Sequence, residues 1–167
     1  PEAPAVLRRT LSEQLLRADL VLLAATGTET LAGVLRELGE VDETALAVAP
    51  AMSGLFALIG DERTPVLVLP GEAVAAYLGY QLFGRSLLRR LAGAQVEREV
   101  VVRPILSKAA LDPSVTTVLL ARLGPRGVTV VDPGSTGAVE LAAADTLVVV
   151  EPGAADVAAH GDVTCWP

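Results

Sequence analysis

One stretch of the sequence decides the fold: Asp19-Leu20-Val21-Leu22-Leu23-Ala24-Ala25-Thr26-Gly27-Thr28-Glu29. One acid followed by a continuous apolar run is typical of a strand buried on both faces, and a polar turn at 26–28 follows it directly. Apolar residues repeat at helical spacing over 5–18 and again over 31–38, where Gly39 stands at the C-cap position. A helix, a strand, a turn and a second helix indicate an α/β layer with parallel strands.

The middle of the chain predicts a hairpin and a long helix. Two apolar runs, 54–59 and 65–69, flank the polar turn at 60–64, which is the pattern of two strands joined by a turn. A short strand is also predicted at 44–48. Leucines at helical spacing then predict a helix over 74–91, with Gly93 as its stop and with Gly79 and Gly84 inside it.

After Gly93 the pattern changes to β-branched runs, which predict strands. The predicted strands are 96–102, 115–123, 128–131 and 145–150, with one more in the tail from 156 to 166. A short helix is predicted over 138–144, after the loop Asp132 to Gly137. We therefore expect two domains, 1–95 of α/β type and 96–167 small and mostly β.

Composition narrows the class of protein. Hydrophobic residues make up 51% of the 167 residues and aromatics only 3%, so the core must consist of Leu, Val and Ala. No apolar run reaches the roughly 18 residues that cross a bilayer, and the N-terminus lacks a secretory pattern, so we expect a cytoplasmic protein without a membrane partner. A net charge of −7 opposes binding to nucleic acid, and the pairs Arg8-Arg9 and Arg89-Arg90 are interpreted as solvated helix faces. One cysteine, Cys165, and one histidine, His160, cannot supply a structural zinc site.

The order of landmarks resembles the molybdopterin molybdenumtransferase family, which includes the C-terminal region of gephyrin. The segments that carry the resemblance are Ala18-Asp19-Leu20-Val21-Leu22, Glu37-Leu38-Gly39, Ala49-Pro50-Ala51, Leu69-Pro70-Gly71-Glu72-Ala73, Gln81-Leu82-Phe83, Leu91-Ala92-Gly93, Pro133-Gly134-Ser135 and Ala142-Ala143-Ala144-Asp145-Thr146-Leu147. The resemblance implies an α/β fold, with a partial MogA-like three-layer α/β unit at 1–95 whose N-terminal half is missing. A small β-barrel-like C-terminal domain at 96–167 would follow.

The resemblance also implies a site. Molybdopterin or its adenylylated form would bind as substrate against Thr26, Gly27 and Thr28, and against the turn that contains Pro70 and Gly71. The further positions that it implies for this ligand are Pro50, Glu72 and Ser135, the last from a neighbouring subunit of a homodimer. Glu29 would be the catalytic acid that helps to place molybdate or Mg²⁺.

Several residues depart from the family pattern and predict impaired molybdate insertion. Ala24 and Ala25 replace paired glycines, Ala49 replaces a lysine, and Glu72 replaces an asparagine beside a site for an anion. A carboxylate there would repel a phosphate. The segment that holds a further acid in the family is shorter in this sequence.

The role of the turn residues and the function of the protein both have alternatives that remain open. Thr26 and Glu29 also fit a capping box, in which each side chain bonds a backbone amide of the other, and Glu72 also fits an acid that stabilises a helix N-terminus. The protein is then a molybdenumtransferase-type enzyme of impaired activity, a dimerising scaffold without catalysis, or a pterin-binding module.

Overall fold

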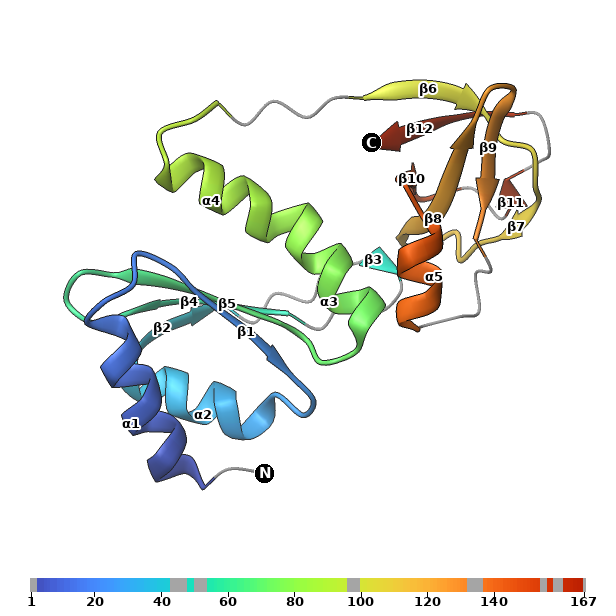
Figure 1. Cartoon of the computed structure of the whole chain (residues 1–167). Helices are drawn as coiled ribbons and strands as arrows, with labels where there is room; N and C mark the ends of the chain where they lie inside the picture. The colour runs from blue at the N-terminus through green and yellow to red at the C-terminus, as the bar shows by residue number, and fades with distance from the viewer. Residues whose placement is uncertain are drawn as a thin grey trace. The chain divides into compact units, whose positions relative to one another are not determined.

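The computed structural model describes residues 3–42, 48–49, 54–95, 100–131, 137–153, 156–157 and 161–166. These residues fall into two compact units, whose elements are drawn in Figure 1. The first unit holds the described residues up to 42, those from 54 to 72, and those from 76 to 95. The second holds 48–49, 73–75 and the described residues from 100 onward.

The first unit contains a mixed sheet with helices before and after its first strand. Its elements up to residue 70 are α1 (Pro4–Leu15), β1 (Val21–Ala25), α2 (Glu29–Leu38), β2 (Gly39–Asp42), β4 (Leu55–Ile59) and β5 (Thr64–Pro70). The strands lie in the order β1-β5-β4-β2. Only β1 and β5 are parallel, whereas β5–β4 and β4–β2 are antiparallel. The predicted hairpin is confirmed, and the expectation of a parallel sheet holds for one pair alone.

Apolar side chains from both helices fill one side of this sheet. Leu11 of α1 and Leu35 of α2 are buried together with Val66 and Val68 of β5. Figure 1 shows α1 and α2 on one face of the sheet and the helix that follows β5 on the other. Helices on both faces of a sheet are the three-layer α/β arrangement expected from the sequence.

Gly39 ends α2 for a reason that differs from the expected one. Its φ of 173° is extended, so the residue does not adopt the left-handed conformation of a C-cap glycine. A Cβ at Gly39 would instead collide with the carbonyl oxygen of Leu58 and would lie 2.9 Å from the Cα of Ile59. The glycine lets β2 start against β4 immediately after the helix.

The predicted long helix is present but contains a π-helical turn. It consists of α3 (Ala73–Gly79), the π-helix η1 (Tyr80–Gly84) and α4 (Arg85–Leu91). A Cβ at Gly84 would lie 2.8 Å from Cδ2 of the Tyr80 ring, so this interior glycine makes room for the ring.

Gly93 stops the long helix, as predicted. It has a φ of +69°, and the amides of Gly93 and Ala94 donate to the carbonyl oxygens of Arg90 and Arg89. These two bonds form a Schellman motif, which satisfies the last carbonyls of the helix.

The second unit is mostly β. Its elements are β3 (Val48–Ala49), β6 (Val101–Pro104), β7 (Ala109–Ala110), β8 (Thr116–Gly124), β9 (Gly127–Val130), α5 (Ala138–Ala143), β10 (Thr146–Val150), β11 (Asp156–Val157) and β12 (Asp162–Trp166). The main sheet has the order β3-β8-β10-β12-β6, with β9 also paired to β8, and β7 pairs with β11. The predicted strands 115–123, 128–131 and 145–150 and the short helix are confirmed.

Three expectations differ in detail. The strand predicted at 96–102 begins at Val101 among the described residues, and most of the strand predicted at 44–48 lies outside them. Val48 and Ala49 lie inside the first predicted domain, yet they form β3 and pair in parallel with Thr116 and Thr117 of β8. Side-chain patterning does not reveal such a short crossing, because two residues carry no period.

Thr117 supplies a test of the second unit's packing. It is 8% exposed, and among the described residues its Oγ1 is a buried side-chain atom without a hydrogen-bond partner. Thr117→Val keeps the volume and removes the uncompensated hydroxyl, so we expect the free energy of unfolding to rise by about 1 kcal/mol in urea titrations. Thr146→Val is the matched control: the Thr146 hydroxyl donates to the carbonyl oxygen of Trp166 at 3.1 Å, and its loss should destabilise by a similar amount. A loss of stability in Thr117→Val would contradict the prediction.

Candidate functional site

The carboxyl ends of β1 and β5 meet at one edge of the first sheet. The parallel register runs from Val21 opposite Val66 to Ala25 opposite Pro70, so both strands end at the same level. Thr26 directly follows β1, and Gly71 directly follows β5. Ligands of α/β proteins commonly bind outside the carboxyl ends of such strands. Two segments that the sequence predicted separately as ligand-binding turns are therefore neighbours in the structure.

Gly71 fixes how closely these turns approach. A Cβ on Gly71 would collide with Cγ2 of Thr26, and it would lie 2.9 Å from the backbone nitrogen of Thr26 and 3.0 Å from the carbonyl carbon of Ala25. Two of these three atoms belong to the backbone, which cannot rotate away as a side chain does. Glycine is thus the residue that the packing requires at position 71.

Gly27 is required by conformation instead. Its φ is +80°, in the left-handed region, and no atom lies within 4 Å of the position that a Cβ would take. Thr26 and Gly27 are exposed and Thr28 is half-buried. The turn therefore presents open backbone to solvent, where a ligand can approach it.

The N-terminus of α2 follows this turn without a side-chain cap. Thr28 is the N-cap residue, and neither its hydroxyl nor another side chain caps the helix. The capping-box interpretation, which placed Thr26 at the cap and Glu29 opposite it, is wrong because the helix begins two residues later than that box requires. Amides in the first turn of an uncapped helix are available to water or to an anion.

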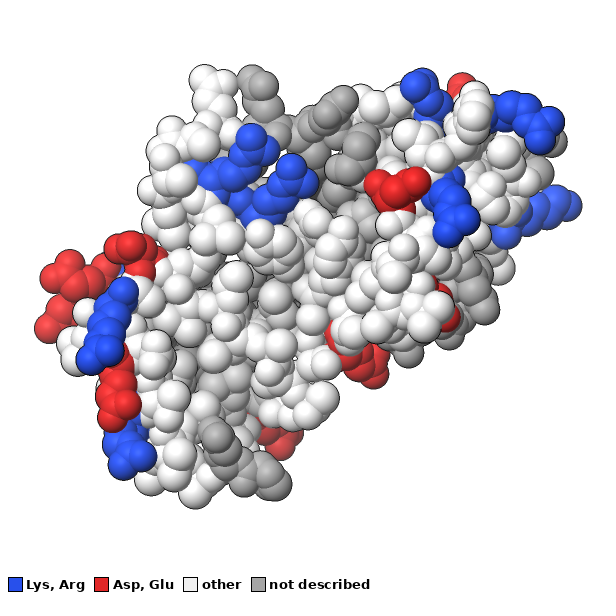
Figure 2. Space-filling model, in the orientation of Figure 1, with Lys and Arg blue, Asp and Glu red and all other residues white. Residues whose placement is uncertain are grey.

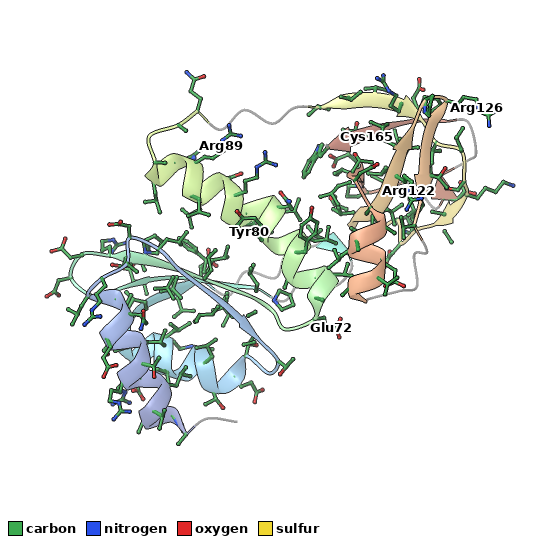
Figure 3. The ribbon with its side chains drawn as sticks, viewed as in Figure 1. Glu72, Tyr80, Arg89, Arg122, Arg126 and Cys165 are labelled. Atoms are coloured by element: carbon green, nitrogen blue, oxygen red, sulfur yellow. The ribbon has the colours of Figure 1, made fainter. Side chains whose placement is uncertain are left out.

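Two exposed carboxylates stand at this edge. Glu29 occupies the first turn of α2, and Glu72 is the N-cap residue of α3, with no side-chain capping bond. Figure 3 shows Glu72 at the turn between β5 and α3 with its side chain pointing outward. Negative charge near a helix N-terminus stabilises the helix, but it also competes with an anionic ligand for the same field.

Of the other residues considered for chemistry, the structure describes Cys165. Pro50, Ser135 and His160 lie outside the described residues. Cys165 of β12 is fully buried, and burial raises the pKa of its thiol. A buried thiol with a raised pKa is a poor nucleophile. Within the ranges that the structure describes, no three His, Cys, Asp or Glu side chains gather as a metal site would need, and no helix is both long and apolar enough to cross a bilayer.

Comparison with known proteins places these features in context. No family model matches the chain. Molybdopterin molybdenumtransferase 1 of Mycobacterium tuberculosis is 29% identical over 114 residues, which are 66% of this chain and 26% of that protein. Over these residues the chain is similar to molybdopterin molybdenumtransferase.

Solved structures show the same fold. A molybdopterin biosynthesis MoeA protein from Pyrococcus horikoshii superimposes with a TM-score of 0.84 at 21% identity, covering 96% of this chain and 40% of the other. A molybdenum cofactor biosynthesis protein from Pyrococcus furiosus gives a TM-score of 0.79 at 18% identity, covering 99% and 55%. This chain thus spans about a quarter of the curated molybdenumtransferase and about half or less of the two solved proteins.

One feature of the first unit was missed in the sequence. The amide of Gln81 donates to the Tyr77 hydroxyl at 2.9 Å, and Arg85 donates to the Gln81 carbonyl oxygen at 3.5 Å. The four-residue spacing of Tyr77, Gln81, Arg85 and Arg89 was the available signal, but Arg89 was assigned together with Arg90 to a solvated face.

Substitution by alanine is predicted to cost different amounts of stability at the two glycines. Gly71→Ala forces the ends of β1 and β5 apart, and we expect a loss of about 2 kcal/mol in the free energy of unfolding. Gly27→Ala meets no neighbour and bears only the cost of the left-handed conformation, about 1 kcal/mol. Urea unfolding of both variants measures the difference. Equal losses would mean that Gly71 does not set the spacing of the two turns.

Proposed function

We propose that this chain belongs to molybdenum-cofactor biosynthesis and binds a phosphorylated pterin, molybdopterin or its adenylylated form, at the carboxyl edge of β1 and β5. The observation that carries the proposal is the packing of Gly71 on Thr26, because it joins the two turns into one surface. The relation to molybdopterin molybdenumtransferase supplies the ligand class.

Different residues of this edge would bind different parts of the ligand or hold the surface in place. The exposed backbone at Thr26 and Gly27 offers polar groups to the ligand, and the uncapped amides at the start of α2 favour a phosphate. Pro70, which is buried at the end of β5, and Gly71 hold the opposite wall of the surface in place. Pro50 and Ser135 remain predicted contacts.

Molybdate insertion is proposed to be impaired. Glu72 places a carboxylate where the related pattern has a neutral amide, and the alanines at 24 and 25 occupy the last two paired positions of β1. Ala25 is half-buried, so it serves the strand and not a flexible turn. An edge with these residues favours binding over turnover.

A magnesium ion would fit this edge only together with a ligand. Mg²⁺ keeps several waters and is usually bound through one or two carboxylates plus substrate phosphates. Glu29, exposed in the first turn of α2, is the residue that would supply the carboxylate. The chain's own contribution is then to orient that carboxylate beside the phosphate.

Ligand titration tests the proposal. We expect wild-type protein to bind molybdopterin with a dissociation constant in the micromolar range, and Glu72→Asn to bind several-fold more tightly because it removes like-charge repulsion. Glu62→Gln, which removes an exposed carboxylate from the β4–β5 turn, is the matched control and should leave affinity unchanged. The assay is fluorescence titration, followed by a molybdate insertion assay.

Three outcomes would contradict the proposal. No binding to either form of the pterin would remove the ligand class, and an unchanged affinity in Glu72→Asn would mean that the phosphate site is misplaced. Rapid insertion of molybdate by the wild type would overturn the proposed impairment. The further variant with Ala24→Gly, Ala25→Gly and Glu72→Asn together should improve binding before it improves insertion.

We further propose that the protein works in the cytoplasm as a homodimer. β1 ends the strand order of its sheet, so among the described residues it pairs with β5 alone, and Leu22 within it is 38% exposed. An apolar edge strand favours association. We expect light scattering to give a dimer, and Leu22→Arg to shift it toward monomer. Leu16→Arg, at an exposed leucine outside the strand, is the control. A monomer at every concentration, or an equal effect of both variants, would count against the dimer.

A further inference from the structure

The long helix is basic, although the protein as a whole is acidic. The whole chain has a net charge of −7, yet residues 73–96 contain three arginines and no acidic residue. Figure 2 shows basic side chains over α4 with no acidic side chain on that helix. Charge of one sign concentrated on one helix marks a surface that attracts the opposite sign.

Four side chains form a row along this helix, which we call the polar stripe: Tyr77, Gln81, Arg85 and Arg89. Hydrogen bonds connect the first three, from Arg85 to Gln81 and from Gln81 to Tyr77. Twelve residues of helix rise by about 18 Å, so the stripe is as long as three helical turns.

The π-helical turn keeps the polar stripe straight. In a regular α-helix each four-residue step passes a full turn by about 40°, so three steps would carry the last side chain about 120° around the helix. The turn at Tyr80–Gly84 contains an extra residue and reduces this drift. Gly84 allows the turn because any Cβ there would strike the Tyr80 ring. The extra residue thus changes how the side chains of the stripe line up on the surface of the helix.

Hydrogen bonding also orders the cation in the stripe. Gln81 accepts from Arg85 while its own amide is held by Tyr77, so the guanidinium is oriented before any partner arrives. An oriented guanidinium loses less conformational freedom on binding a carboxylate. Leu88 and Leu91, 39% and 47% exposed, lie at three-residue steps from Arg85 and add apolar area beside the charge.

We propose that the polar stripe, with Leu88 and Leu91, docks an acidic α-helix of a partner protein. Rows of side chains at four-residue spacing pack against equivalent rows of another helix, and a partner with Asp or Glu at that spacing would meet Arg85 and Arg89 in turn. A second copy in two-fold pairing is disfavoured, because it would set arginines against arginines. The two cations and tyrosine beside exposed leucines suit a protein interface better than the extended phosphate contacts of nucleic acid.

The arginines of the stripe are separate from the proposed pterin site. The pterin edge lies at the start of the long helix, and Arg85 lies about 18 Å along it from Ala73, whereas Tyr77 lies about 6 Å along it. Docking and pterin binding are therefore independent proposals, and failure of either leaves the other standing.

A designed peptide provides the test. The probe is a fluorescein-labelled helical peptide of about 20 residues, with glutamate at every fourth position and leucine three residues after each. A second peptide has glutamine in place of each glutamate. Fluorescence anisotropy with the full chain should show saturable binding of the glutamate peptide and binding of the glutamine peptide weaker by about tenfold or more.

Variants then locate the binding surface. Arg85→Glu with Arg89→Glu should weaken binding by about tenfold or more, and Gln81→Ala by about threefold, because it removes the group that orients Arg85. Arg85→Lys keeps the charge but lacks the planar, two-pronged guanidinium. Its affinity for the glutamate peptide should lie between those of the wild type and of the double reversal. Arg17→Glu, on the exposed segment between α1 and β1, changes the net charge by two units, as each single reversal in the stripe does, and should leave affinity unchanged. Circular dichroism and melting confirm that each variant is folded.

Several results would overturn the proposal. Absence of saturable binding, or an equal loss for Arg17→Glu, would show that the stripe is not a specific surface. Tighter binding of an RNA oligonucleotide, or of vesicles containing phosphatidylserine, than of the glutamate peptide would assign the stripe to another class of partner. Full affinity in Gln81→Ala would mean that the hydrogen-bonded row has no part in it.

Discussion

The contact of Gly71 with Thr26 is the constraint on which the rest of the first unit depends. Because a Cβ at this position would meet backbone atoms, β1 and β5 end at the same level only if residue 71 is glycine. Both following helices, α2 and α3, start within a few residues of the same contact. The ligand surface and the origin of the long helix therefore lie at one edge of the sheet.

The sequence predicted those features that depend on the pattern of neighbouring residues. The hairpin at β4–β5, the stop at Gly93 and the candidate turns near Gly27 and Gly71 follow from turn chemistry and helical spacing. Long-range pairing was not predictable in the same way. Nothing local in Val48-Ala49 indicates that it joins β8, and nothing near Gly39 announces the close approach of β4.

The predicted site was correct in its segments and wrong in one of its details. The turns at 26–28 and 70–72 are neighbours, which sequence order alone does not require, whereas the capping box failed because a one-dimensional pattern does not fix the residue at which a helix starts. Pro50 and Ser135 lie outside the described residues, so their placement stays a prediction. The stripe on α3–α4 was missed although its residues stand four apart, because Arg89 was interpreted as part of a solvated face and because sequence spacing does not reveal the π-turn inside the helix.

Anion binding and partner docking are proposed for two different regions of the first unit. At the start of α2 and α3, backbone amides and exposed carboxylates compete for an anion, and Glu72 weakens whatever phosphate binds there. Farther along, the charged residues from 73 to 96 are all arginines. A partner docked on the stripe would meet the arginines without touching the ligand, so docking and phosphate binding are governed by different charges. The two surfaces of one helix then act on association and on pterin binding separately.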